Sequence, residues 1–246
     1  MSKEKIEAAK NRICLALDVD DAQHAVSLAK LLEKHVGLFK IGSELYTTVG
    51  PNIVEALVGL GTPVFLDLKF HDIPNTVNRV VRVVTRLGVS MFNIHAVGGV
   101  EMIQAAVNAA QDEASIQGVS PPLVLAVTVL TSIDNEILQK ELLIDKPVES
   151  FVRHLATMAK NHGADGVVAS PKEVRIIRET CGEKFSIVTP GVRPAGSSVG
   201  DQKRIATPSD AIRQGSDYVV IGRPILTADD PVDAAQKIAK EIAGVI

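Results

Sequence analysis

Short apolar runs recur eight times along the chain and alternate with segments of helical periodicity. Most of these runs are too continuously apolar for strands with one face in water, a pattern typical of parallel strands that are covered by helices. The runs occupy residues 13–19, 38–41, 64–68, 91–94, 123–130, 166–169, 186–188 and 218–221. This alternation predicts eight consecutive βα units.

The segments between the runs have the features of helices. Apolar residues recur at positions i, i+3, i+4 and i+7, as at Val77, Val80, Val81 and Val84, which places them on one helix face. Glycine precedes the next run where a left-handed helix end is expected, at Gly37, Gly61, Gly88, Gly163 and Gly215. Proline marks several expected helix starts, at Pro51, Pro74, Pro171, Pro208 and Pro231.

Eight βα units without an internal linker predict an α/β fold, a single-domain (β/α)8 TIM barrel over residues 1–246. Residues 1–12 are predicted to form an N-terminal helical extension of that domain. A doubly wound open sheet is the alternative arrangement. Its dinucleotide-binding form needs a glycine-rich first turn, where this chain has Asp18-Val19-Asp20-Asp21. The closed barrel is therefore the predicted fold.

Charge and apolar run length exclude some kinds of binding partner. Lys and Arg number 26 and Asp and Glu number 29, a net charge of -3, so no excess of positive charge is available for a nucleic acid backbone. The longest wholly apolar runs, such as residues 123–127, are far shorter than the roughly 20 residues of a membrane span. Residues 1–12 alternate charges and lack the apolar stretch of a secretion signal, and the two cysteines form no disulfide framework. We therefore expect a cytoplasmic protein without a nucleic acid or membrane partner.

Side chains at the carboxyl ends of barrel strands meet around one mouth, so polar residues that follow the apolar runs are candidates for chemistry. They are Asp18, Lys40, Asp67, Lys69, Asp72, His95, Thr131, Ser132, Ser170, Arg193 and Arg223. Asp67 and Lys69 lie two residues apart in one predicted strand, so both are expected on the same face. Buried charges are costly unless paired, and alternation with Lys40 supplies the pairing. Such an array either serves as a structural ion pair or holds a lysine in position to act on a substrate atom.

Two later segments have the composition of an anion site. Residues 189–194 read Thr-Pro-Gly-Val-Arg-Pro and precede a Ser- and Gly-rich stretch that ends in Asp201-Gln202, which indicates a closing loop. Residues 221–224 read Ile-Gly-Arg-Pro, where glycine lets backbone N–H groups approach an anion and Arg223 can bind it through two donors. Barrels often bind phosphate after strands seven and eight, where both segments fall. A zinc hydrolase is not expected, because no His-x-His or His-Glu-x-x-His spacing is present.

The motifs occur in the order of a known enzyme family. They are Leu-Asp at 17–18, Phe-Lys-Ile-Gly at 39–42, Asp-x-Lys-x-x-Asp at 67–72, Leu-Thr-Ser at 130–132, Thr-Pro-Gly-Val-Arg-Pro at 189–194, Asp-Gln at 201–202 and Ile-Gly-Arg-Pro at 221–224. With them, the chain closely resembles the bacterial form of the orotidine 5'-monophosphate decarboxylase family over residues 13–225. Related magnesium-dependent enzymes share Asp-x-Lys-x-x-Asp but have an acidic metal ligand at the end of the second strand, where this chain has Lys40.

The resemblance implies decarboxylation of orotidine 5'-monophosphate to uridine 5'-monophosphate and CO2, the last step of de novo pyrimidine nucleotide synthesis, with no cofactor and no metal. It implies that Lys69 stabilises a carbanion at C6 of the pyrimidine and then protonates it. Asp67 would lie near the departing carboxylate, where it either raises the ground state or positions Lys69. Asp18 and Lys40 would hold the ribose hydroxyls, and Lys40 would also link Asp67 into the charge array.

The remaining assignments follow from the same resemblance. Around the pyrimidine and the phosphate they are Thr131, Ser132, Pro190, Arg193, Gln202, Gly222 and Arg223, with Gln202 bridging phosphate and base. Asp72, as part of the catalytic set, and Thr76 match positions that family members contribute across a homodimer interface. A magnesium-dependent sugar-phosphate lyase or epimerase on the same barrel, and an inactive nucleotide-binding barrel, are the alternative functions.

Overall fold

A closed barrel of eight parallel strands forms the centre of the molecule in the computed structural model, which describes residues 2–194 and 206–246. The strands follow one another around the barrel in chain order, and β8 pairs with β1. They are β1 (Ile13–Ala16), β2 (Leu38–Gly42), β3 (Val64–Phe70), β4 (Met91–His95), β5 (Leu123–Val127), β6 (Gly166–Val168), β7 (Ser186–Thr189) and β8 (Tyr218–Ile221). The predicted (β/α)8 barrel is confirmed, and each predicted run overlaps one strand.

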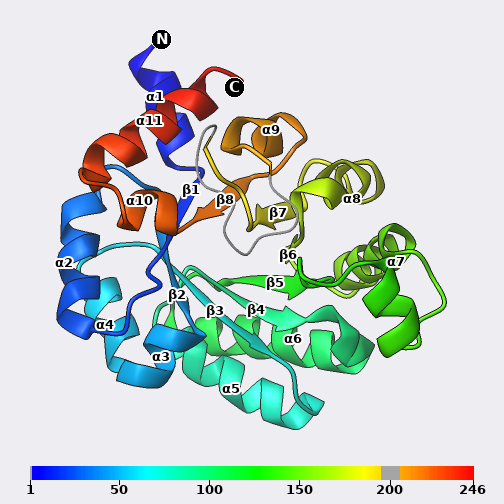
Figure 1. The fold of residues 1–246 in the computed structure, drawn as a ribbon. Coiled ribbons are helices and arrows are strands. Elements are labelled where there is room, and N and C mark those ends of the chain that lie inside the picture. Colours follow the sequence, from blue (N-terminus) through cyan, green and yellow to red (C-terminus); the bar gives the residue numbers. More distant parts are fainter. Residues whose placement is uncertain (1, 195–205) are drawn as a thin grey trace.

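Helices cover the outside of the barrel, as Figure 1 shows. They are α1 (Lys3–Lys10), α2 (Ala22–Leu32), α3 (Ser43–Val49), α4 (Asn52–Gly59), α5 (Pro74–Arg86), α6 (Gly99–Gln117), α7 (Val148–Asn161), α8 (Val174–Cys181), α9 (Pro208–Arg213), α10 (Arg223–Leu226) and α11 (Pro231–Ala243). Short 3-10 turns at Ala96–Gly98 and Pro171–Glu173 and a π-helical turn at Ile137–Glu141 lie in the connections. Helix α1 packs beside α11, which brings the two ends of the chain close together (Figure 1).

The sheet has an apolar zone on each of its faces. Phe65 belongs to a small buried cluster with Cys14, Leu38 and Met91, whereas its neighbour Leu66 belongs to the large cluster shared with the helices. Successive side chains of a strand point to opposite faces, so the small cluster fills the barrel and the large one lies between strands and helices. Water is excluded from both faces, which explains why the strands read as continuous apolar runs.

The glycines before the strands have two different uses. Gly61, Gly88, Gly163 and Gly215 have φ between 76° and 109°, the left-handed conformation predicted for a helix end. Gly37 does not belong with them, because it has no positive φ. A Cβ at Gly37 would lie 2.3 Å from the carbonyl oxygen of Asn11, so this glycine allows two backbone segments to approach closely.

No helix within residues 2–194 and 206–246 is long and apolar enough to cross a membrane.

Cys14, inside the barrel, and Cys181, at the end of α8, are both free and buried. Burial raises the pKa of each thiol above its usual value, which makes both of them poor nucleophiles.

Candidate active site

Four charged side chains form one array at the mouth of the barrel. Lys40 Nζ lies 3.1 Å from Asp18 Oδ1 and 3.5 Å from Asp67 Oδ2. Lys69 Nζ lies 2.6 Å from Asp67 Oδ1. The charges therefore alternate in sign from Asp18 through Lys40 and Asp67 to Lys69, which is the pairing expected from the sequence. Because the residues come from the ends of β1, β2 and β3, neighbouring strands bring them together.

Lys40 is the buried centre of this array, with only 10% of its side chain exposed. Burial by itself lowers the pKa of an ammonium, but the Asp67 and Asp18 carboxylates outweigh burial and raise the pKa of Lys40 above its usual value. Gly42, two residues further along β2, leaves room for it, because a Cβ there would lie 2.8 Å from Lys40 Nζ. Lys40 thus keeps its charge although its side chain is buried.

Lys69 reaches the mouth through an irregularity in β3. Its φ of 53° is a left-handed conformation that is unusual for any residue other than glycine. The pairing of β3 with β4 shifts register between Leu66 and Phe70, which is the mark of a β-bulge. Asp67 and Lys69 do meet on one side, as predicted, but regular alternation along a strand is not the cause. The bulge turns Lys69 into contact with Asp67.

Asn93 of β4 is a site residue that the sequence reasoning missed. It is completely buried, its Nδ2 donates a hydrogen bond to Asp67 Oδ1 at 2.7 Å, and its Oδ1 accepts one from the Lys69 backbone N–H at 2.8 Å. A signal was available, because Asn93 is a polar residue inside an apolar run and lies two residues from Met91, which points into the barrel. Alternation along β4 therefore predicts an inward-pointing amide at this level of the barrel.

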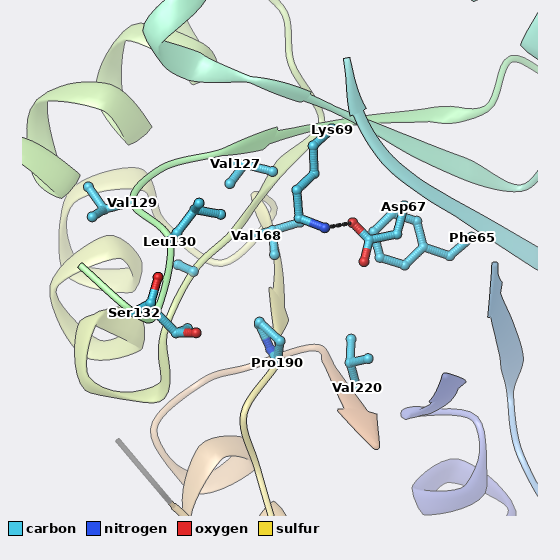
Figure 2. A pocket seen from close by; sticks show the side chains of 12 residues that line it. Phe65, Asp67, Lys69, Val127, Val129, Leu130, Ser132, Val168, Pro190 and Val220 are labelled. Atoms are coloured by element: carbon cyan, nitrogen blue, oxygen red, sulfur yellow. Dashed lines mark hydrogen bonds and ion pairs between the residues drawn. The ribbon is translucent and has the colours of Figure 1, made fainter. Parts of the chain in front are cut away.

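A cavity of about 260 Å³ opens beside the Asp67–Lys69 pair. Most of the side chains that line it are apolar. Thr131, Ser132 and Pro190, which were expected to bind substrate, also line this cavity. Figure 2 shows the Asp67–Lys69 pair on one side of this cavity and Ser132 on the other. We call this cavity the apolar lobe. A charge held against such a surface acts more strongly than it would in water.

A second cavity of about 170 Å³ adjoins the apolar lobe and is more polar. Asp67, Pro190 and Val220 line both cavities, so the two form one continuous site. Asp18 and Lys40 line the second cavity alone. We call it the cationic lobe because of the arginines that complete it.

Arg193 and Arg223 line the cationic lobe from the ends of β7 and β8. Arg193 is 8% exposed, whereas Arg223 is exposed at the first position of α10. Gly222 lies beside Arg223, and a Cβ there would lie 3.3 Å from Asp18 Oδ2 and 3.4 Å from the Ala16 Cβ. The backbone at Gly222 thus stays accessible from the lobe. Two guanidinium groups beside an open backbone are suited to binding a phosphate group.

Two of the expected residues do not line the site of this chain. Asp72 is exposed, its Oδ1 accepts a hydrogen bond from the Ile73 backbone N–H at 2.6 Å, and Thr76 lies in the first turn of α5. Neither residue lines the apolar or the cationic lobe. Gln202 lies outside the described residues.

Ser170 is a strand-end residue with a structural use. It is completely buried, and its hydroxyl accepts a hydrogen bond from the Lys172 backbone N–H. The Glu173 carboxylate in turn accepts one from the Ser170 backbone N–H at 2.9 Å. This reciprocal arrangement is a capping box. Ser170 therefore starts the next helical turn and does not line either lobe.

His95 ends β4 beside the array, with its ring centroid 5.5 Å from that of His71. Burial lowers the pKa of His95, and electrostatic interactions with the neighbouring His71 ring and the Lys69 ammonium lower it further. The His95 ring is therefore neutral at neutral pH. It adds no positive charge to an array whose charges are already paired.

The carboxylates of the array are engaged by lysines. Asp18 pairs with Lys40, and Asp67 pairs with both Lys40 and Lys69. In the part of the chain that the structure describes, no group of three or more His, Cys, Asp or Glu side chains is placed to hold a metal ion. A ligand in the two lobes thus meets fixed ammonium and guanidinium groups.

The sequence has close relatives among known proteins. The pattern of the orotidine 5'-phosphate decarboxylase / HUMPS family matches residues 11–238. The orotidine 5'-phosphate decarboxylase of Moorella thermoacetica is 52% identical over 234 residues, which cover 95% of this chain and 93% of that protein. The protein of the same name from Syntrophomonas wolfei is 52% identical over 235 residues, which cover 95% of this chain and 98% of that one.

Solved structures give the same result. The crystal structure of orotidine 5'-phosphate decarboxylase from Lactobacillus acidophilus matches with a TM-score of 0.81 and 40% identity, over 94% of this chain and 98% of that one. The corresponding structure from Pyrococcus horikoshii matches with a TM-score of 0.75 and 26% identity, over 95% of this chain and all of that one. The similarity therefore extends over the barrel as a whole.

Proposed function

This chain belongs to the orotidine 5'-phosphate decarboxylase / HUMPS family, and we propose that it converts orotidine 5'-monophosphate into uridine 5'-monophosphate and CO2. The observation that carries the proposal is the Lys69 ammonium, held 2.6 Å from Asp67 at the edge of an apolar lobe. The reaction is the last step of pyrimidine nucleotide synthesis, and we place it in the cytoplasm. The enzyme is a carboxy-lyase.

The two lobes fit the two ends of such a nucleotide. The pyrimidine occupies the apolar lobe, where Thr131 and Ser132 supply hydrogen-bonding groups at its edge. The phosphate occupies the cationic lobe with Arg193 and Arg223. The ribose lies between them, next to Asp18 and Lys40. Because the lobes meet at Asp67 and Pro190, this orientation brings C6 of the ring to the Asp67–Lys69 pair.

In the chemical step, the bond between C6 and the carboxylate carbon breaks and CO2 leaves. The electron pair stays on C6 in the plane of the ring, where it cannot delocalise into the π-system. The Lys69 ammonium stabilises that charge as a preorganised cation, and its Nζ then donates a proton to C6. Asp67 holds the ammonium in place, and Lys40 balances the charge of Asp67 from the other side.

The test of the function is the loss of the ultraviolet absorbance of the orotate ring when purified protein meets orotidine 5'-monophosphate. We expect the rate of this loss to be unchanged after exhaustive chelation, because Asp18 and Asp67 are held by lysines and a nearby ammonium repels a divalent cation. Activity that disappears with the chelator and returns with magnesium would favour the metal-dependent lyase instead.

The proposed binding of phosphate by Arg223 gives a second prediction. Arg223→Ala should lower kcat/KM for orotidine 5'-monophosphate about a hundredfold, or about 2.7 kcal/mol, because a charge-assisted contact to the phosphate is lost. Any slow reaction of the unphosphorylated nucleoside should hardly change, because that substrate never makes the contact.

A matched control for this variant is Arg213→Ala, which removes an exposed arginine of α9 that pairs with Asp210. Its kinetics with both substrates should equal those of the parent. If Arg223→Ala instead reduces the rates with both substrates equally, Arg223 supports the fold or the ring site and does not bind phosphate.

We further propose that the active form is a homodimer in which Asp72 and Thr76 complete the neighbouring site. Their absence from the lobes of their own chain supports this arrangement. Ile73 and Val97, in the segments after the adjacent strands β3 and β4, are 66% and 46% exposed. Apolar side chains of this size are suited to an interface with a second copy.

A further inference from the structure

Asn93 faces the bulge that carries Lys69. Leu66 of β3 pairs with Phe92 of β4, and Phe70 pairs with Ile94. Three residues of β3, numbered 67 to 69, therefore lie opposite a single residue of β4, which is Asn93. The Asn93 side chain forms hydrogen bonds with both ends of the extra segment, at Asp67 and Lys69.

The two ends of that segment need different bonding partners. The backbone N–H of Lys69 lies within the register shift, and Asn93 Oδ1 accepts its hydrogen bond at 2.8 Å. The Asp67 carboxylate needs donors, and Asn93 Nδ2 supplies one at 2.7 Å. An amide provides an acceptor and a donor in one rigid group. Leucine, of similar shape, provides neither.

We propose that Asn93 is a positioning residue that fixes Lys69 and Asp67 before substrate binds. It lines neither the apolar nor the cationic lobe, so it acts through the two residues that it holds. Without the amide, the left-handed backbone at Lys69 loses a bond that stabilises it, and the Asp67 carboxylate is held only by the lysines. The ammonium and the carboxylate then become free to shift together relative to C6.

The inference rests on the proposed decarboxylase activity, and its main test is Asn93→Leu. We expect kcat to fall about a hundredfold, since a displacement of about 1 Å of a reacting group can cost that much. The dissociation constant for uridine 5'-monophosphate should change less than about threefold, because the groups that bind ribose and phosphate remain. A crystal structure of the variant should show Lys69 displaced from Asp67 or out of its left-handed conformation.

Met91→Ala is the matched control. Met91 lies on the same strand and the same inward face, two residues away, and belongs to the buried cluster inside the barrel. This substitution should lower the melting temperature, because it leaves a void, and it should leave kcat within about threefold of the parent. If Asn93→Leu fails to fold, as judged by circular dichroism, Asn93→Ala replaces it in every comparison.

The possible outcomes separate the inference from the function. A folded Asn93→Leu or Asn93→Ala enzyme with kcat within threefold of the parent overturns the positioning role. So does a parallel loss of kcat and of nucleotide affinity, because it would mean that Asn93 supports the whole pocket. A parent protein that does not decarboxylate the substrate overturns the proposed function itself.

Discussion

Lys69→Ala is expected to lower turnover of orotidine 5'-monophosphate at least about ten-thousandfold, or about 5.4 kcal/mol of barrier. The reason is that one substitution removes both the cation that stabilises the C6 carbanion and the proton that quenches it. Binding of uridine 5'-monophosphate should stay within about tenfold of the parent, because the product carries no developing charge for Lys69 to stabilise. Single-turnover kinetics and calorimetric titration measure the two quantities.

The fold should tolerate this substitution, because Asp67 keeps two partners. Lys40 Nζ remains 3.5 Å from its Oδ2, and Asn93 Nδ2 remains 2.7 Å from its Oδ1. Lys237→Ala is the matched control, since Lys237 pairs with Asp233 at 2.6 Å on the exposed side of α11. That variant should be as active as the parent. Turnover within about tenfold of the parent in Lys69→Ala would show that another group protonates the ring.

The positions of the strands could be predicted from the sequence, but most of their carboxyl ends could not. The predicted runs at 13–19 and 123–130 are longer than β1 (Ile13–Ala16) and β5 (Leu123–Val127). The reason is that apolar residues continue beyond the paired strand. Val129 and Leu130 line the apolar lobe, and Leu17 is completely buried. Continuous hydrophobicity reports burial, and burial extends past the ends of these two strands into the site.

The charged array could be predicted because its chemistry is visible in residue types and their spacing. The bulge and the hydrogen bonds that hold the array in place could not be predicted from residue types and spacing. The left-handed φ of Lys69 occurs at a residue other than glycine, so composition gives no sign of the bulge. Asn93 lies in the middle of an apolar strand and acts across strands. Ser170 is a polar residue at a strand end like Lys40, and only hydrogen bonding shows that it caps a turn.

The proposed homodimer leads to the second large effect, which concerns Asp72. Asp72 follows Lys69 by three residues, yet it is exposed and lines neither lobe. If Asp72 completes the array of the neighbouring chain, Lys69→Ala and Asp72→Ala damage different members of each site. Each homodimer then has two defective sites, and both should be nearly inactive.

Mixing the two inactive variants should restore about a quarter of the parental activity. In a mixed dimer, one site combines both substitutions, while the other combines an intact Lys69 with an intact Asp72. Random reassortment makes about half of the dimers mixed, and each of these has one good site of two. The chains are exchanged by mild denaturation and renaturation, native mass spectrometry confirms the mixed dimers, and the loss of orotate absorbance measures activity. Confirmed mixed dimers without recovered activity would mean that Asp72 does not complete the array of a neighbouring chain. The exposed position of Asp72 would then have no catalytic meaning, and the array would depend on the residues of a single barrel.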